Sequence, residues 1–198
     1  MRVSRMQAER NRQKVIDVAS RLFREHGFDG IGLKDLMKNA GLTQGAFYKQ
    51  FASKDDLAAQ ASRRAFESAS CRWSSAIEAN PGNPLEAVLD FYLSTDHLEE
   101  RMDGCPIVAL GSDAARQGSA VKESFEAGIK THLEVLDHLV GQEETGGRAM
   151  SVLSTMVGAL ILSRAIDDTQ LSRQILKAAA DSVRQAVAVD GGAGGSLQ

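Results

Sequence analysis

Three polar side chains and a glycine around residue 46 form a set that could contact a nucleic acid. Gln44 carries an amide that bonds to base edges, and Gly45 allows the backbone to approach closely. Tyr48 supplies a phenol and Lys49 a cation for phosphate. Nothing in this set suits bond-making chemistry. The pattern therefore predicts a surface that binds nucleic acid.

Two short helices and a glycine turn must hold these side chains. Leu33–Ala40 is apolar at i, i+3, i+4 and i+7, which predicts a helix of about two turns. Gly41 follows where a helix ends in a left-handed residue, and Thr43 begins the next helix. Because that second helix is too short to be stable alone, we expect Phe47 and Phe51 to anchor it.

This order is that of a helix-turn-helix motif, whose second helix enters the major groove. The alternative is an ordinary helical hairpin within a bundle. A supporting helix is predicted before the motif, at Ala8–His26, and a long one after it, at Lys54–Ala79, opened by Ser53. The residues expected to contact DNA are Lys34, Thr43, Gln44, Gly45, Ala46, Tyr48, Lys49 and Lys54.

From about Arg10 to Leu57 the chain resembles the TetR family of bacterial transcriptional regulators. The matching residues are Phe23, Gly27, Phe28, Ala40, Gly41, Tyr48, Phe51, Lys54 and Leu57. Gly32 and Met37 depart from the family, which usually has Thr or Ser and a small Ala there. The resemblance implies that the fourth helix is a lever, which moves the reading helix when its far end tilts.

Charge is divided unevenly along the 198 residues. Residues 1–60 hold 11 Lys and Arg against 7 Asp and Glu, a charge of +4, whereas the remainder holds 12 against 19, a charge of −7. The basic excess lies where phosphates are expected. Two distant cysteines and a polar N-terminus indicate a cytoplasmic protein, and the longest apolar run is too short to span a membrane.

The whole chain is predicted to be all-α, with about nine helices and two domains. Residues 1–53 form a three-helix DNA-binding domain, and residues 54–189 form a helical ligand-binding and dimerisation domain. Pro84, preceded by Asn83, is expected to open one helix that runs to about Glu100. Residues 190–198 are Gly-rich and are expected to be a disordered tail without function.

The last two helices, Arg148–Ala165 and Thr169–Val189, are the predicted dimer interface. A single helix-turn-helix reads few base pairs, so a two-fold dimer on a near-palindromic operator is expected. In the resembled family the equivalent pair forms a four-helix bundle between subunits; the alternative is an internal core. The residues assigned to this interface are Leu153, Val157, Leu160, Ile161, Ile175, Leu176, Ala179 and Val183.

Bulky side chains in the middle helices are candidates for an apolar effector pocket, although such residues are more often ordinary core. They are Phe66, Trp73, Phe91, Tyr92, Met102, Phe125 and Met156. An effector that prefers the conformer with badly spaced reading helices would lower operator affinity by linkage.

Cys105 is a second candidate signal receiver. It directly precedes Pro106, the expected first residue of a helix, where backbone N–H groups favour a thiolate. The resemblance supports this, because some TetR-like repressors sense electrophiles or oxidants through a cysteine near this place. An inert structural thiol is the alternative.

These features together predict a dimeric, ligand- or stress-responsive transcriptional regulator, most simply a repressor, whose partners are operator DNA and an unidentified effector. A thiol-based sensor repressor using Cys105 is the alternative. An enzyme is not expected, since no nucleophile and base pair, phosphate loop, metal set or cofactor motif is present, and the four histidines lack metal-ligand spacing. The acidic charge of residues 61–198 does not suit a non-specific DNA-organising protein.

Overall fold

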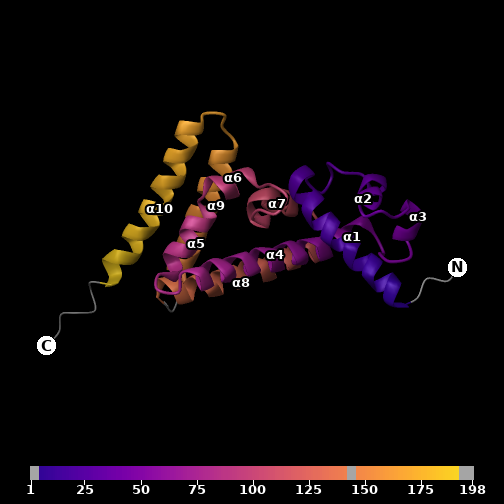
Figure 1. The fold of residues 1–198 in the computed structure, drawn as a ribbon, viewed down its shortest axis with the longest axis horizontal. Coiled ribbons are helices and arrows are strands. Elements are labelled where there is room, and N and C mark those ends of the chain that lie inside the picture. The colour runs from indigo at the N-terminus through magenta and orange to yellow at the C-terminus, as the bar shows by residue number, and fades with distance from the viewer. Residues whose placement is uncertain (1–4, 142–145, 192–198) are drawn as a thin grey trace. The chain divides into compact units, whose positions relative to one another are not determined.

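A computed structural model describes residues 5–141 and 146–191, and every regular element in these ranges is a helix (Figure 1). The all-α prediction is therefore confirmed. The helices are α1 (Arg5–His26), α2 (Leu33–Asn39), α3 (Gln44–Phe47), α4 (Lys54–Ala79), α5 (Pro84–Tyr92), α6 (Thr95–Glu99), α7 (Pro106–Ala114), α8 (Ser119–Val140), α9 (Gly147–Arg164) and α10 (Thr169–Gly191).

One predicted helix, Pro84 to Glu100, is wrong, because it is two helices. Pro84 occupies the first turn of α5 as expected, but α5 ends at Tyr92. Ser94 then adopts an extended backbone, and its hydroxyl accepts a 3.0 Å hydrogen bond from the N–H of His97. This side-chain cap starts α6 as a separate helix. A serine at that position was the signal for the break.

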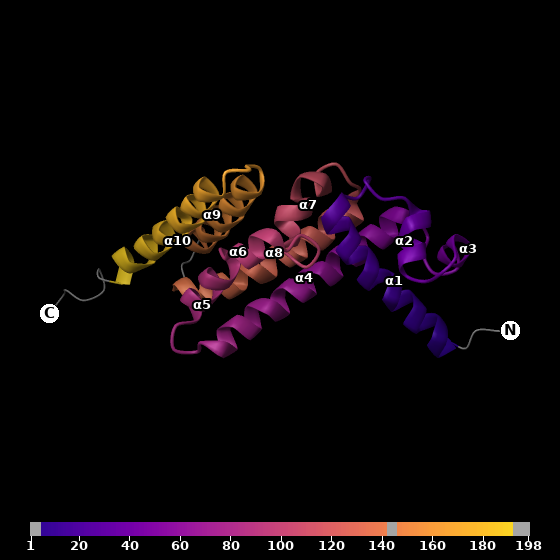
Figure 2. The same cartoon turned by 45° about the horizontal axis from the view of Figure 1, so that its top comes forward.

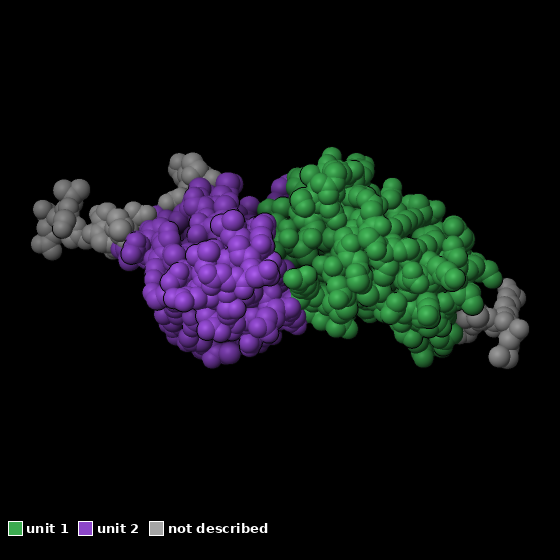
Figure 3. Space-filling model, turned by 90° about the horizontal axis from the view of Figure 1, so that it is seen from above, with its two compact units in different colours: residues 1–71, 101–129 green, residues 72–100, 130–198 purple. Residues whose placement is uncertain are grey.

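The chain divides into two compact units, shown in different colours in Figure 3. Unit 1 comprises residues 1–71 and 101–129, and unit 2 comprises residues 72–100 and 130–198. Both α4 and α8 contribute to each unit, and the predicted domain boundary at residue 53 falls inside unit 1. Of the predicted tail, residues 190–191 belong to α10 and residues 192–198 lie outside the described residues.

Unit 1 has an apolar core that supports the first helices. Phe23, Leu36 and Phe47 are each no more than 1% exposed and belong to the same cluster. Burying three such side chains contributes about 1.5–3 kcal/mol each, which compensates for the low intrinsic stability of α2 and α3. The short helices are therefore fixed by packing against α1 and the start of α4.

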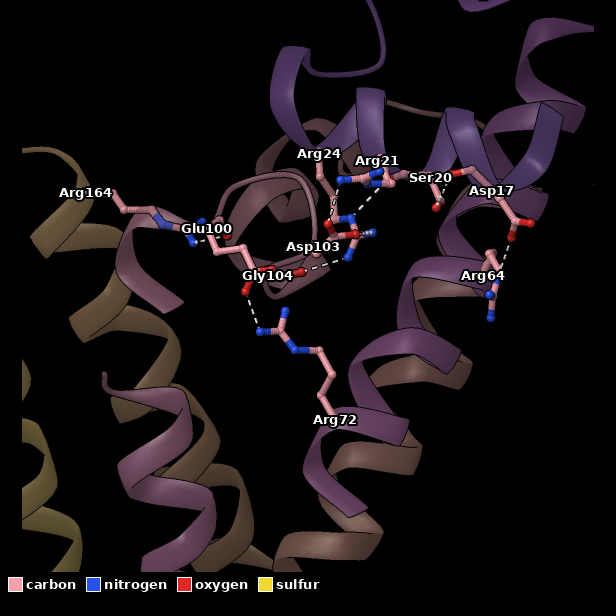
Figure 4. A network of polar contacts seen from close by, with 10 residues as sticks. All are labelled: Asp17, Ser20, Arg21, Arg24, Arg64, Arg72, Glu100, Asp103, Gly104 and Arg164. Carbon is pink, nitrogen blue, oxygen red and sulfur yellow. Dashed lines mark hydrogen bonds and ion pairs between the residues drawn. The ribbon is translucent and has the colours of Figure 1, made fainter. Parts of the chain in front are cut away.

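A buried arginine ties α1 to the segment before α7 within unit 1 (Figure 4). Arg24 is 4% exposed; its Nη1 donates to the carbonyl of Gly104 and its Nε to the carbonyl of Ser20, both at 2.9 Å. Asp103 lies 3.7 Å from Arg24 Nη2 and 2.9 Å from Arg21 Nη2.

Unit 2 is built around a hairpin of α9 and α10, which lie side by side in Figures 1 and 2. Ser163 and Ser172 each donate a hydroxyl hydrogen bond to the other's carbonyl, at 3.2 and 3.3 Å. Arg164, at the end of α9, donates to the carbonyls of His97, Leu98 and Glu100 at 2.8–3.2 Å. These bonds satisfy the free carbonyl groups at the C-terminal end of α6.

Candidate nucleic-acid interface

The turn between α2 and α3 has the geometry that the sequence predicts. Gly41 has a φ of +72°, in the left-handed region that favours glycine. The N–H of Gly41 donates to the carbonyl of Lys38, and the N–H of Leu42 to that of Met37, both at 2.9 Å. These bonds close the end of α2, so the chain reverses within a few residues and presents α3 at a fixed angle.

Two aromatic side chains anchor α3 to the apolar core of unit 1. Phe47 is 1% exposed and Phe51 4%, and their rings stack with centroids 5.3 Å apart. Arg12 of α1 places its guanidinium 5.3 Å from the centre of the Phe51 ring and donates a hydrogen bond to Gln60. The anchoring role predicted for both phenylalanines agrees with this packing, and Arg12 adds a contact that the sequence did not reveal.

The outer face of α3 is open to solvent. Tyr48 is 68% exposed, and its ring meets Phe47 edge-on with the ring centroids 5.3 Å apart. Gln44, Gly45 and Lys49 are also exposed. This small face combines an amide, a phenol, a cation and a position without a side chain. It has the donors and acceptors that contacts to base edges and phosphates require.

The remaining predicted DNA contacts have different surroundings. Thr43 is at the N-cap of α3, yet its side chain makes no capping bond, so its exposed hydroxyl is available to a ligand. Lys34 is exposed, and Ala46 is half-buried against the core. Lys54 is half-buried and donates from Nζ to the carbonyl of Ile31 at 2.8 Å, which gives it a structural role beside any phosphate contact.

Lys14 is a candidate phosphate ligand that sequence reasoning missed. It is exposed on α1, and its Nζ lies so near the α2–α3 turn that a Cβ placed on Gly41 would be 3.3 Å away. The only sequence signal was its membership of the basic first helix. Its position adds a cation beside the predicted reading face, where it would increase sequence-independent affinity.

The side chains predicted to line one effector pocket belong to two separate groups. Phe66 and Phe125 meet edge-on at 5.1 Å in unit 1, whereas Trp73 and Tyr92 do so at 5.9 Å in unit 2. Of the others, Met156 is 0% exposed, and Phe91 is half-buried with the guanidinium of Arg72 over its ring. Met102 lines a cavity of about 790 Å³ beside α2. Of the two cavities described, neither is lined by any of the other six.

The predicted sensor and interface residues are placed as follows. Cys105 is 4% exposed and is the N-cap residue of α7, with Pro106 in the first turn as predicted. Five of the eight interface residues are at most 8% exposed within the single chain: Leu153, Leu160, Leu176, Ala179 and Val183. Of the other three, Val157 and Ile175 are half-buried and Ile161 is 45% exposed.

The fold and this exposed α3 face define a helical protein with an N-terminal helix-turn-helix, and comparison with known proteins agrees. Residues 15–61 match the profile of the family described as bacterial regulatory proteins, tetR family. The HTH-type transcriptional regulator LmrA of Bacillus subtilis is 25% identical over 154 residues, which cover 76% of this chain and 82% of LmrA.

Solved structures of regulators show the same fold. A TetR-family transcriptional regulator from Cytophaga hutchinsonii aligns with a TM-score of 0.77 and 20% identity, covering 93% of this chain and 98% of that one. The reduced form of Escherichia coli NemR aligns with a TM-score of 0.74 and 20% identity, covering 89% and 96%. Residues 15–61 thus match the helix-turn-helix domain of the TetR family of bacterial transcriptional regulators, and the similarity of the rest of the chain to such regulators supports a DNA-binding regulator. Across residues 5–141 and 146–191, no helix is long and apolar enough to cross a membrane.

Proposed function

We propose that this chain is a ligand-responsive repressor that binds a near-palindromic operator as a homodimer and releases it when an effector binds to the C-terminal part. The observation that carries the proposal is the α3 face, where exposed polar side chains stand on the buried pair Phe47 and Phe51. A tyrosine with most of its surface exposed serves recognition better than stability. The repressor role is the simplest consequence of occupying an operator.

Replacing Tyr48 and Lys49 together by Ala is expected to weaken operator binding by about a hundredfold or more. Each contact to a base or phosphate contributes about 1–3 kcal/mol, and both side chains are exposed. The measurement is the affinity for an operator selected from genomic fragments, at fixed salt. Lys122→Ala, which removes an exposed cation from α8, is the matched control. Wild-type affinity in the double variant would contradict the proposed reading face.

An uncharged stripe along α9 and α10 supports the homodimer. Met150, Ile161 and Leu162 of α9 are 45–57% exposed, and Leu171 of α10 is 44% exposed. Several large apolar side chains exposed on one helical hairpin favour an interface there. The proposed interface therefore keeps the predicted Val157, Ile161 and Ile175 and extends along the solvent face of the hairpin.

Placing a charge in this stripe is expected to separate the subunits. Ile161→Glu introduces a carboxylate that dimerisation would have to bury, at a cost of several kcal/mol. Sedimentation should therefore show a monomer at concentrations where the wild type is a dimer, with unchanged helical content. Gln170→Glu, at an exposed position off the stripe on α10, should remain dimeric. A dimeric Ile161→Glu protein would place the interface elsewhere.

The second candidate function is a thiol-based sensor repressor. Cys105 at the N-cap of α7 is the observation that favours it, and one of the similar structures is the reduced form of NemR. We expect mild oxidant to abolish operator binding of the wild type and of Cys71→Ser, whose thiol is exposed, but not of Cys105→Ser. Equal loss in wild type and Cys105→Ser would eliminate this candidate.

A further inference from the structure

A pocket of about 260 Å³ lies within unit 2 and is lined by residues of α5 and α10, by Leu93 and by Thr95 at the start of α6. Its apolar lining consists of side chains that are each at most 9% exposed: Leu89, Leu93, Leu176 and Ala180. The volume is just below the roughly 300–1,000 Å³ of sites for drug-sized ligands. The pocket therefore suits a smaller molecule with an apolar body.

Three cations border this apolar lining, and two of them are already paired. Arg184 donates from Nε to both carboxylate oxygens of Glu86 at 3.0 Å and pairs with Asp181. Its hydrogen bonds lower the pKa of Glu86, so that carboxylate stays charged. Lys177 is bound to Asp181 through its Nζ. Neither cation needs a ligand.

Arg173 differs from these two. It lines the pocket and is exposed, and it makes no hydrogen bond or ion pair with any residue that the structure describes. Asp90 is the carboxylate of the lining, and it lies 3.6 Å from Arg184. The one uncommitted charge among the lining residues is therefore positive. A guanidinium presents a planar fork of donors that matches a carboxylate.

The pocket is compatible with a dimer formed through the apolar stripe. Leu171 and Ile175 of the stripe lie on one side of α10, whereas Arg173 and Lys177 each stand two positions after one of them. Two positions correspond to about 200° around a helix, so the pocket and the stripe are on opposite sides. A second subunit on the stripe leaves the pocket open.

We propose that this pocket binds a small organic acid, with its apolar body against the leucines and its carboxylate paired to Arg173. Such a ligand would connect α5 to α10 within unit 2. A role for this ligand as the effector that releases DNA rests on the function proposed above, whereas binding itself does not.

Octanoate, a carboxylate on an unbranched alkyl chain, is the probe for calorimetric titration of the full chain. We expect one octanoate site per chain. Octylamine and octanol should bind at least about tenfold more weakly than octanoate. Arg173→Gln should weaken octanoate binding about tenfold without changing octanol binding, and Lys122→Gln should leave both unchanged. Equal affinity for octanoate and octylamine, or wild-type octanoate binding by Arg173→Gln, would overturn the proposal.

Filling the apolar lining provides an independent test. Ala180 is 8% exposed, and Ala180→Leu places a branched side chain in the pocket, so binding of octanoate and octanol should fall together. Unaltered octanoate binding in a folded Ala180→Leu protein would refute this site. Because the titration uses no DNA, it tests the pocket independently of the repressor function. A chain that binds operator but not octanoate contradicts only the pocket. A chain that binds octanoate but no operator contradicts only the repressor function.

Discussion

Gly128→Ala is expected to lower the free energy of unfolding by about 3 kcal/mol, as overpacking of a rigid core does. A Cβ on Gly128 would lie 2.2 Å from Cγ of Phe66 and 2.3 and 2.5 Å from its two Cδ atoms. The ring cannot simply turn away, because it is 4% exposed and meets Phe125 edge-on at 5.1 Å. Glycine thus lets α8 approach α4 inside unit 1, which also contains the helix-turn-helix.

Chemical denaturation of three variants tests this close approach. Gly111→Ala is the matched control, because Gly111 is also helical and in unit 1, but the nearest atom to its Cβ position is 3.7 Å away. That variant should gain about 0.5–1 kcal/mol from helix propensity. The double variant Gly128→Ala with Phe66→Leu should be more stable than Gly128→Ala, since the smaller side chain leaves room for the added Cβ. A Gly128→Ala protein as stable as the wild type would show that the ring moves freely.

The DNA-reading part was predictable because its signals are local. Gly41 determines the turn, and the spacing of Leu36, Met37 and Phe47 places their side chains inward whatever the rest of the chain does. Each signal acts within one helix or turn. The same holds for Pro84 and Pro106, which both open helices as expected.

The burial of individual side chains could not be predicted in this way on helices that are apolar on more than one side. Leu160 and Ile161 are adjacent on α9, yet one is 0% exposed and the other 45%. Sequence alone cannot tell which apolar side meets the same chain, because that depends on how α9 and α10 pack together. Similarly, Phe66 and Trp73 lie on the same helix, α4, but belong to different units. Their residue types could not show that they do not share one pocket.

Buried polar groups were missed for a related reason. Arg24 has the character of a surface residue in sequence, yet it is buried, where it bonds to the nearby carbonyl of Ser20 and the distant carbonyl of Gly104 and lies near the carboxylate of Asp103. His97 is likewise a polar residue in a predicted helix, whereas the structure leaves it 3% exposed among aromatic rings. Partners distant in sequence, which spacing does not show, determine whether such a group is tolerated inside.

The buried His97 makes the stability of unit 2 depend on pH. Burial lowers its pKa from 6.5 to about 4, with the nearby positive charges of Arg164 and Arg72 acting in the same direction. Glu100 and the backbone carbonyl of Tyr92 oppose the shift; that carbonyl accepts a 2.7 Å hydrogen bond from Nδ1 of the neutral ring. Phe91 stacks on the ring at 5.4 Å, which leaves little room for water around a charged imidazole.

Between about pH 6.5 and pH 4 the unfolded chain therefore takes up a proton that folded His97 does not. Stability should be complete above pH 6.5 and should fall as the pH is lowered through this window, by about 3 kcal/mol in total. The measurement is the free energy of unfolding from urea titrations at several pH values. His97→Asn keeps an amide donor for the Tyr92 carbonyl but does not titrate, so its stability should vary less with pH by that amount. Identical pH dependence in the two proteins would mean that the imidazole is protonated equally well inside and outside the fold.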